Sequence, residues 1–251
     1  KKTNEIRSGQ LNLDKDYDYW LMKFDNVSKN GDHGLEDEPE YTLIEYAYYK
    51  MALDAGIQMN ECRIYSKAGE NHFMTKRFDR IDGKKVHMQS LGAIAHISYK
   101  EPRLCSYEMA AQYMQEMNLP MKDIEQFYRR MVFNCIAVNQ DDHVKNISFL
   151  MDRSGKWRLS PAYDMTFSYN VMNKWLSAHQ MTVNGKKSGI DLDDLLMTGT
   201  KMGLRKKKCV DIISQVSIVV SKFARYAEEL KIKEKTILDI EKILAQNKVE
   251  I

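Results

Sequence analysis

The stretch that decides the fold is Asp141-Asp142-His143-Val144-Lys145-Asn146, a polar run in a chain of 251 residues. An apolar stripe of helical period precedes it and predicts a helix over residues 122–137. Residues 147–151 and 156–159 follow and indicate a hairpin, and a polar loop that carries Asp164 comes next. The local order is therefore helix, polar loop, hairpin and second polar loop. The stripe consists of Ile124, Phe127, Tyr128, Met131, Val132 and Cys135.

The acidic and amide residues of this order have the spacing of a phosphoryl-transfer site. In kinase folds, an Asp that accepts the proton of the attacking hydroxyl precedes a metal-binding Asn by about five positions, and a second metal-binding Asp follows. Asp141 and Asn146 have this spacing, and Asp164 follows the predicted hairpin. Lys145 could supply a cation that stabilises charge on the phosphate oxygens. The Asp–Asn pair alone is almost uninformative, but its place between a helix and a hairpin favours this chemistry.

Two further residues of the run have more than one interpretation. His143 could contact a metal or a cofactor, and we include it among the candidate cofactor contacts. A lone His beside carboxylates more often makes a structural hydrogen bond, and that role is the favoured one. Asp142 either supports the loop or is simply solvated, and the sequence does not choose between these two roles.

A lysine near the N-terminus is the next candidate. Residues 18–24 indicate a strand, and Lys23 lies in this apolar setting, where a charged residue needs a reason. Glu45 lies in the first turns of a helix predicted over residues 44–55. In kinase folds a strand lysine of this kind binds the ATP phosphates and pairs with a helix Glu. The alternative is a lysine on the solvent face of an edge strand.

Two more strands are predicted over residues 61–65 and 72–78, with a turn at Ala68-Gly69 between them. The segment 75–79 closes the second strand and is a candidate hinge. There, backbone groups near Lys76 would meet adenine and Phe78 would form an apolar wall. The alternative is a plain strand end.

Helical patterns dominate the rest of the chain, over residues 107–117, 191–197, 208–229 and 235–246. The fold class is therefore α+β, with a bilobal, protein-kinase-like architecture. We expect a small strand-rich lobe over residues 1–80 and a larger, mainly helical lobe over residues 81–251. Because no Pro-rich or Ser-rich linker separates them, the two lobes should pack together.

Composition excludes several other classes of protein. The formal net charge of +3 does not indicate a nucleic-acid binder, and the basic run 205–208 is interpreted as a solvated helix start. No segment approaches the roughly 18 apolar residues of a membrane span. No two cysteines have CxxC spacing, so we expect them to be reduced and mostly buried, as in a cytoplasmic protein. The cysteines are Cys62, Cys105, Cys135 and Cys209.

Two motifs and three shorter segments of this chain match one known family. The motifs are Asn139–Asn146 and Trp157–Asp164; the segments are Trp20–Phe24, Lys76–Arg80 and His179–Met181. Together they resemble the HipA family of bacterial serine/threonine kinases. The resemblance implies a bilobal kinase fold, ATP and Mg²⁺ as cofactors, and phosphorylation of protein Ser or Thr. It also implies that Asp141 is the catalytic base, that Asn146 and Asp164 are metal ligands, and that Lys23 contacts the phosphates.

The family also implies partners. Its members often act as toxins that a helix-turn-helix antitoxin of the HipB type holds inactive, so contact with DNA would be indirect, through the antitoxin. A protein would be the substrate, and aminoacyl-tRNA synthetases are substrates known in the family. The alternatives are a small-molecule phosphotransferase of the same fold, a catalytically silent module that binds ATP or the antitoxin, and a metal-dependent phosphohydrolase.

The sequence departs from the family pattern at three points. No Gly-rich or Ser-containing phosphate loop is visible before Lys23, and we expect that loop, with any autophosphorylation site, to precede Lys1. The chain resembles the short form of the family, without the N-terminal subdomain of the longer members. Finally, the family often has Glu where Lys76 stands.

Overall fold

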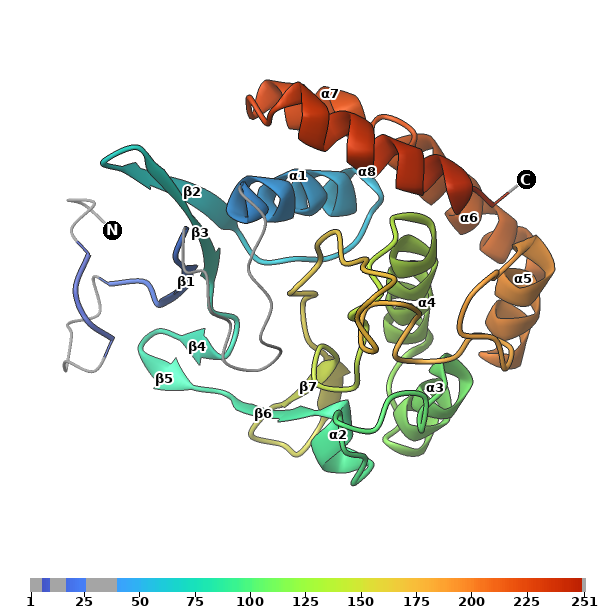
Figure 1. Cartoon of the computed structure of the whole chain (residues 1–251). Helices are drawn as coiled ribbons and strands as arrows, with labels where there is room; N and C mark the ends of the chain where they lie inside the picture. The colour runs from blue at the N-terminus through green and yellow to red at the C-terminus, as the bar shows by residue number, and fades with distance from the viewer. Residues whose placement is uncertain (1–5, 10–16, 26–39, 250–251) are drawn as a thin grey trace.

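The structure, a computed structural model, describes residues 6–9, 17–25 and 40–249 (Figure 1). The strands expected in the first part of the chain are present as β1 (Trp20–Lys23), β2 (Cys62–Lys67) and β3 (Glu70–Lys76). They form an antiparallel sheet of order β1-β3-β2, in which β1 is an edge. The turn between β2 and β3 lies at Ala68-Gly69 as predicted, and both residues have positive φ.

The predicted hairpin is confirmed as β7 (Ser148–Met151) and β8 (Trp157–Leu159). Sequence patterns did not indicate a third strand of this sheet, β6 (His87–Ser90), which pairs with β7 as an edge. Most of β6 is exposed, so it lacks the alternation of apolar and polar residues that marks a half-buried strand. In sequence order, a short two-stranded ribbon of β4 (Arg80–Ile81) and β5 (Lys84–Lys85) comes between β3 and β6.

Helices make up most of the remaining structure. In chain order they are α1 (Tyr41–Asp54), α2 (Leu91–Ile94), α3 (Tyr107–Glu116), α4 (Met121–Ile136), α5 (Leu192–Lys201), α6 (Lys206–Val220), α7 (Phe223–Glu229) and α8 (Glu234–Gln246). The basic residues that begin α6 are exposed, in agreement with a solvated helix start.

The prediction of a single helix over residues 208–229 is wrong, because the helix is interrupted between the end of α6 at Val220 and the start of α7 at Phe223. Lys222, with φ −104° and ψ 17°, leaves the helical region. The new direction turns Phe223, Tyr226 and Ala227 into the core, where α7 packs against α1. Neither Gly nor Pro marks this break, so tertiary packing alone sets it.

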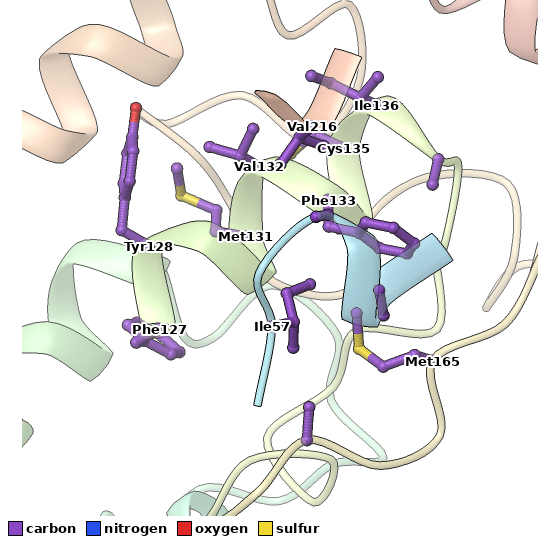
Figure 2. Packing of buried hydrophobic residues seen from close by; sticks show 14 of the residues in the cluster. Ile57, Phe127, Tyr128, Met131, Val132, Phe133, Cys135, Ile136, Met165 and Val216 are labelled. Carbon is purple, nitrogen blue, oxygen red and sulfur yellow. The ribbon is translucent and has the colours of Figure 1, made fainter. Parts of the chain in front are cut away.

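Helix α4 is the centre of the hydrophobic core (Figure 2). The whole predicted stripe is buried. All residues of the helix from Phe127 to Ile136 are buried as well. Helix α1 joins both parts of the molecule, since it packs on β2 and β3 on one side and on α6 and α7 on the other (Figure 1). Tyr48 of α1 makes an edge contact with Phe133 of α4 and donates a hydrogen bond of 2.7 Å to the carbonyl of Ala137.

The four cysteines are free and buried, as the sequence predicts. Among the residues that the structure describes, no helix combines the length and the apolar character that a membrane crossing requires.

Close packing around α5 depends on a residue without a side chain. A methyl group on Gly199 would lie 2.5 Å from Cys209 Sγ and 2.7 Å from a ring carbon of Tyr128. We expect Gly199→Ala to lower the free energy of unfolding by about 1–2 kcal/mol in urea titrations, since overpacking outweighs the better helix propensity of Ala. The neighbouring Thr200→Ala, on the exposed side of α5, should change it by less than about 0.5 kcal/mol. A neutral Gly199→Ala would contradict this packing.

Candidate active site

Lys23 stands at the end of β1 and bridges two carboxylates. Its Nζ lies 2.8 Å from Oε1 and 3.0 Å from Oε2 of Glu45, and 2.7 Å from Oδ1 of Asp164. Glu45 comes from the second turn of α1 and is 2% exposed, whereas Asp164 follows β8. The structure therefore brings together three of the residues that the sequence singled out, from three separate elements. β1 is an edge strand and the Lys23 side chain is 40% exposed, but its ammonium group is paired with both carboxylates.

The three charges perturb one another. Burial alone would lower the pKa of Lys23, but the carboxylates of Glu45 and Asp164 outweigh it and hold that pKa well above its usual value. Burial raises the pKa of Glu45 to about 7, although Lys23 pulls it down. Burial also acts to raise the pKa of Asp164, but the attraction of Lys23 prevails and lowers it. Lys23 and Asp164 are thus charged at neutral pH, while Glu45 titrates near it.

The catalytic-loop candidates lie between α4 and β7. Asn146 closes the loop, since its side-chain amide donates a 2.9 Å hydrogen bond to the carbonyl of Asp141. Two carbonyls of the loop, those of Val144 and Ile147, accept hydrogen bonds from the first turn of α2. Asn146 and Asp164 line one small cavity together, so the two predicted metal ligands are neighbours.

The segment that carries Asp164 is fastened to this loop. The hydroxyl of Tyr163 donates to the carbonyl of Lys145 at 2.6 Å and contacts Ser148 Oγ at 2.5 Å. Asp164 itself has φ +52°, a left-handed conformation that Asp adopts more readily than most residues other than glycine. The contacts of Tyr163 hold the backbone directly before Asp164 in place.

Asp142 is buried, and the structure decides between its two interpretations. Its side chain accepts hydrogen bonds from Tyr107 Oη at 2.8 Å and from the amide of Gln180 at 2.7 Å, and it lies 2.8 Å from Nδ1 of His179. It supports the loop and is not solvated. Sequence reasoning left this role open because the three partners lie far from Asp142 along the chain.

His143 and Lys145 flank the same aromatic ring. The His143 ring meets Tyr99 at a centroid distance of 5.7 Å, and Lys145 Nζ lies 3.9 Å from the centroid of that ring. His143 Nε2 is 3.9 Å from Asp141 Oδ1, and its Nδ1 is buried without a hydrogen-bond partner. The roles of both residues toward a cofactor stay predictions.

The candidate hinge lies at the end of β3. The backbone amide of Lys76 is used within the sheet, where it donates to the carbonyl of Glu61 at 2.8 Å, and its Nζ lies 3.2 Å from Asp18. The Phe78 ring packs at 5.6 Å from the ring of Tyr163, the residue before Asp164. Phe78 is therefore beside the candidate site, and the contact of either residue with adenine stays a prediction.

The family model for the HipA-like C-terminal domain matches residues 2–223. The chain belongs to this family. Two curated relatives agree with it. A Haemophilus influenzae protein named "Putative kinase" is 28% identical over 159 residues, which cover 56% of this chain and 46% of that protein. "Putative kinase Y4dM" of Sinorhizobium fredii is 27% identical over 181 residues, which cover 70% of this chain and 41% of that protein. The aligned part of the chain thus spans less than half the length of these two relatives.

Solved structures confirm the α+β, bilobal, kinase-like fold. HipA of Shewanella oneidensis, in a complex with HipB and operator DNA, matches with a TM-score of 0.69 at 17% identity, over 91% of this chain and 56% of that one. The Helicobacter pylori proinflammatory kinase CtkA matches with a TM-score of 0.52 at 12% identity, and the match covers 91% of this chain and 94% of CtkA. At these identities the likeness shows the fold alone. The lobe boundary near residue 80 stays a prediction.

The raised pKa of Glu45 makes stability depend on pH. Because this pKa moves from 4.5 to about 7 on folding, the folded protein binds the proton more tightly than the unfolded chain does. The resulting stabilisation is complete below pH 4.5 and is lost as the pH rises through 7. As the pH rises from 4.5 to above 7, the free energy of unfolding of the wild type should therefore fall by up to about 3 kcal/mol relative to that of Glu45→Gln.

Urea titrations at half-unit pH steps measure this difference. Glu228→Gln, an exposed site on α7, is the matched control and should follow the wild type throughout. A wild-type curve that stays parallel to that of Glu45→Gln would contradict the assignment.

Proposed function

We propose that this chain carries the active site of a HipA-like serine/threonine kinase, which transfers the γ-phosphoryl group of ATP to a protein hydroxyl. The observation that carries the proposal is the bridge from Lys23 to Glu45 at 2.8 Å and to Asp164 at 2.7 Å. In kinases the pairing of a strand lysine with a helix Glu prepares the lysine for the phosphates, and an Asp after the catalytic loop binds the metal.

Each residue of the bridge and of the loop has a part in this reaction. Asp141 orients the acceptor hydroxyl and takes its proton, while the hydroxyl oxygen forms a bond to the γ-phosphorus and the bond from that phosphorus to the ADP oxygen breaks. Lys23 binds the phosphates, and Glu45 orients Lys23. Lys145, held over Tyr99, is the second cation beside the transferred group. Phe78 and the backbone near Lys76 bind adenine, and His143 completes the contacts to the nucleotide.

The donor set fits magnesium. Asn146 and Asp164 offer an amide oxygen and a carboxylate that line one cavity, and Mg²⁺ prefers oxygen ligands of this kind. They would hold Mg²⁺, which neutralises phosphate charge when it is bound. Asp142, by contrast, is 3% exposed and already accepts hydrogen bonds from protein groups. That use of Asp142 disfavours a phosphohydrolase that would need it as a metal ligand.

Transfer of label from γ-labelled ATP by the full-length protein into a bacterial lysate tests this function. We expect a labelled protein band that depends on Mg²⁺, with label on Ser or Thr. Asp141→Asn should reduce the labelling at least about 100-fold, because proton transfer by a positioned base contributes this much. Asp193→Asn, an exposed position in α5, is the matched control and should label like the wild type.

The outcomes separate the candidate functions. Release of free phosphate without a labelled band would favour hydrolysis and contradict the kinase assignment. Label on small molecules alone would favour a small-molecule phosphotransferase. Binding of ATP with no turnover at all would favour the silent module.

We further propose that the protein acts as a toxin and that a HipB-type helix-turn-helix antitoxin is its partner, with DNA contacted only through that antitoxin. The support is the solved complex of Shewanella HipA with HipB and operator DNA, together with membership of the family. Expression of the full-length protein in a bacterial host should arrest growth, and Asp141→Asn should not. Equal growth of the two cultures, at matched protein levels, would contradict the toxin role.

A further inference from the structure

A buried hydrogen-bonded chain connects the two halves of the candidate site. It begins at Asp142, next to the candidate base, where the Tyr107 hydroxyl donates at 2.8 Å. The same hydroxyl accepts from Asn134 Nδ2 of α4 at 3.0 Å. Asn134 Oδ1 in turn accepts from Asn139 Nδ2 at 3.0 Å, and this amide also reaches the carbonyl of Asp164 at 3.4 Å. One polar path thus runs from the catalytic loop to the backbone of the predicted metal ligand.

The far side of Asp142 is held just as closely. Segment 103–107 and segment 180–182 lie side by side, with backbone hydrogen bonds from Arg103 to Gln180 at 2.7 Å and from Tyr107 to Thr182 at 3.0 Å. Tyr107 and Gln180, which both donate to Asp142, are therefore fixed relative to each other. The two groups that donate to Asp142 are thus held by two hydrogen-bonded backbone segments, 103–107 and 180–182.

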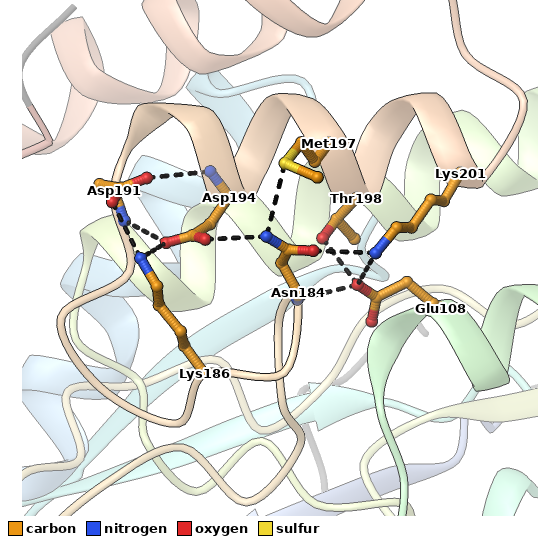
Figure 3. Close-up of polar contacts among 8 residues, drawn as sticks. All are labelled: Glu108, Asn184, Lys186, Asp191, Asp194, Met197, Thr198 and Lys201. Atoms are coloured by element: carbon orange, nitrogen blue, oxygen red, sulfur yellow. Dashed lines mark hydrogen bonds and ion pairs between the residues drawn. The ribbon is translucent and has the colours of Figure 1, made fainter.

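A polar cluster on α5 anchors the next turn of the chain (Figure 3). Asn184 and Gly185 both have positive φ and form a tight turn. The Asn184 amide donates to Glu108 of α3 at 2.8 Å, and its side chain donates to Asp194 at 3.0 Å. This cluster keeps segment 180–182 against α3, immediately beside Tyr107.

Two residues with positive φ lie at the end of the hydrogen-bonded chain where Asn139 meets Asp164. Val138, which precedes Asn139, has φ +55°, and Asp164 has φ +52°. A β-branched residue in the left-handed region is an outlier that persists only where its surroundings enforce it. Asn139 contacts the backbone of Asp164 and follows Val138, so the polar path reaches both strained positions.

We propose that Tyr107 is a positioning residue for phosphoryl transfer, an inference that rests on the proposed kinase function. Its hydroxyl is the link between Asp142 and Asn134, so it sets the distance from the loop with Asp141 to the segment with Asp164. Without that link Asp142 keeps two of its partners, and the loop becomes mobile instead of unfolding. The nucleotide contacts of Lys23 and Glu45 do not involve Tyr107.

Tyr107→Phe removes the hydrogen bonds to Asp142 and Asn134 and keeps the ring, because it deletes a single oxygen from a side chain that is 1% exposed. We expect kcat to fall about 10- to 100-fold, since small misplacement of a catalytic group has effects of this size. The affinity for Mg-ATP should change much less than kcat, because the ion pairs of Lys23 with Glu45 and with Asp164 hold the lysine and the Asp164 side chain even when the chain from Tyr107 to the Asp164 carbonyl is broken. A merely structural role would not separate kcat from nucleotide affinity in this way.

Tyr128→Phe is the matched control. Tyr128 is also fully buried, and its hydroxyl donates a 3.1 Å hydrogen bond to the carbonyl of Leu195 in α5, away from the catalytic loop. This variant should lose a similar amount of stability in urea titrations and keep its kcat. A comparable fall of kcat in both variants would overturn the proposal.

Hydrogen exchange gives a readout that does not need turnover. Three amides of the loop region are hydrogen-bonded and report on it, those of Asn139, Gln140 and Asn146. Exchange over residues 139–146 should be faster in Tyr107→Phe and unchanged in Tyr128→Phe. If the wild type transfers label, kcat decides the inference. If it does not, the kinase proposal fails by itself, and unchanged exchange in Tyr107→Phe would then overturn the positioning role separately.

Discussion

The bridge that Lys23 makes to Glu45 and Asp164 is the interaction around which the candidate site is arranged. Two carboxylates and one ammonium group meet where β1, α1 and the segment after β8 converge. Removing charges from water is costly, and a single ammonium group neutralises only one of the two carboxylates. Burial raises the pKa of Glu45, which means that burial of this carboxylate disfavours its charged form. A cluster with this cost is more readily explained by chemistry than by folding.

Helix α1 makes that convergence possible. It carries Glu45 toward β1 on one side and packs against α6 and α7 on the other. The hydrogen bond from Tyr48 to the carbonyl of Ala137 ties the same helix to the end of α4, just before the catalytic loop begins. In kinases the position of the helix that carries the Glu controls whether the lysine is ready for nucleotide. Here that helix is part of the common hydrophobic core, so its position is fixed by packing.

The sequence predicted those features that local patterns specify. The stripe from Ile124 to Cys135 identified α4, the turn residues 152–155 identified the β7–β8 hairpin, and the polar run identified a loop between them. The charged residue within an apolar strand marked Lys23, and the structure places Glu45 and Asp164 beside it. In each case a few neighbouring residues carry the whole signal, either as a periodicity or as a residue that is out of place.

Features that depend on distant contacts were not predictable in this way. The break at Lys222 follows from the burial of Phe223 against α1, and β6 exists because β7 offers it an edge. The sequence did not decide whether Asp142 supports the loop or is solvated, since its partners are contributed by α3 and by segment 179–180. The Asn184-Gly185 turn did carry a local signal, because this dipeptide favours hairpin turns.

The partners of Asp142 also order the events of biosynthesis. A ribosome releases the catalytic loop well before it releases His179 and Gln180, so a nascent chain that ends between them has Asp142 without two of its three partners. The segment with Asp164 emerges in the same interval. During that interval the loop has its sequence but lacks the frame that holds its shape. The frame around Asp142 can therefore be completed only once residue 180 has been synthesised, and α5 to α8 follow it along the chain.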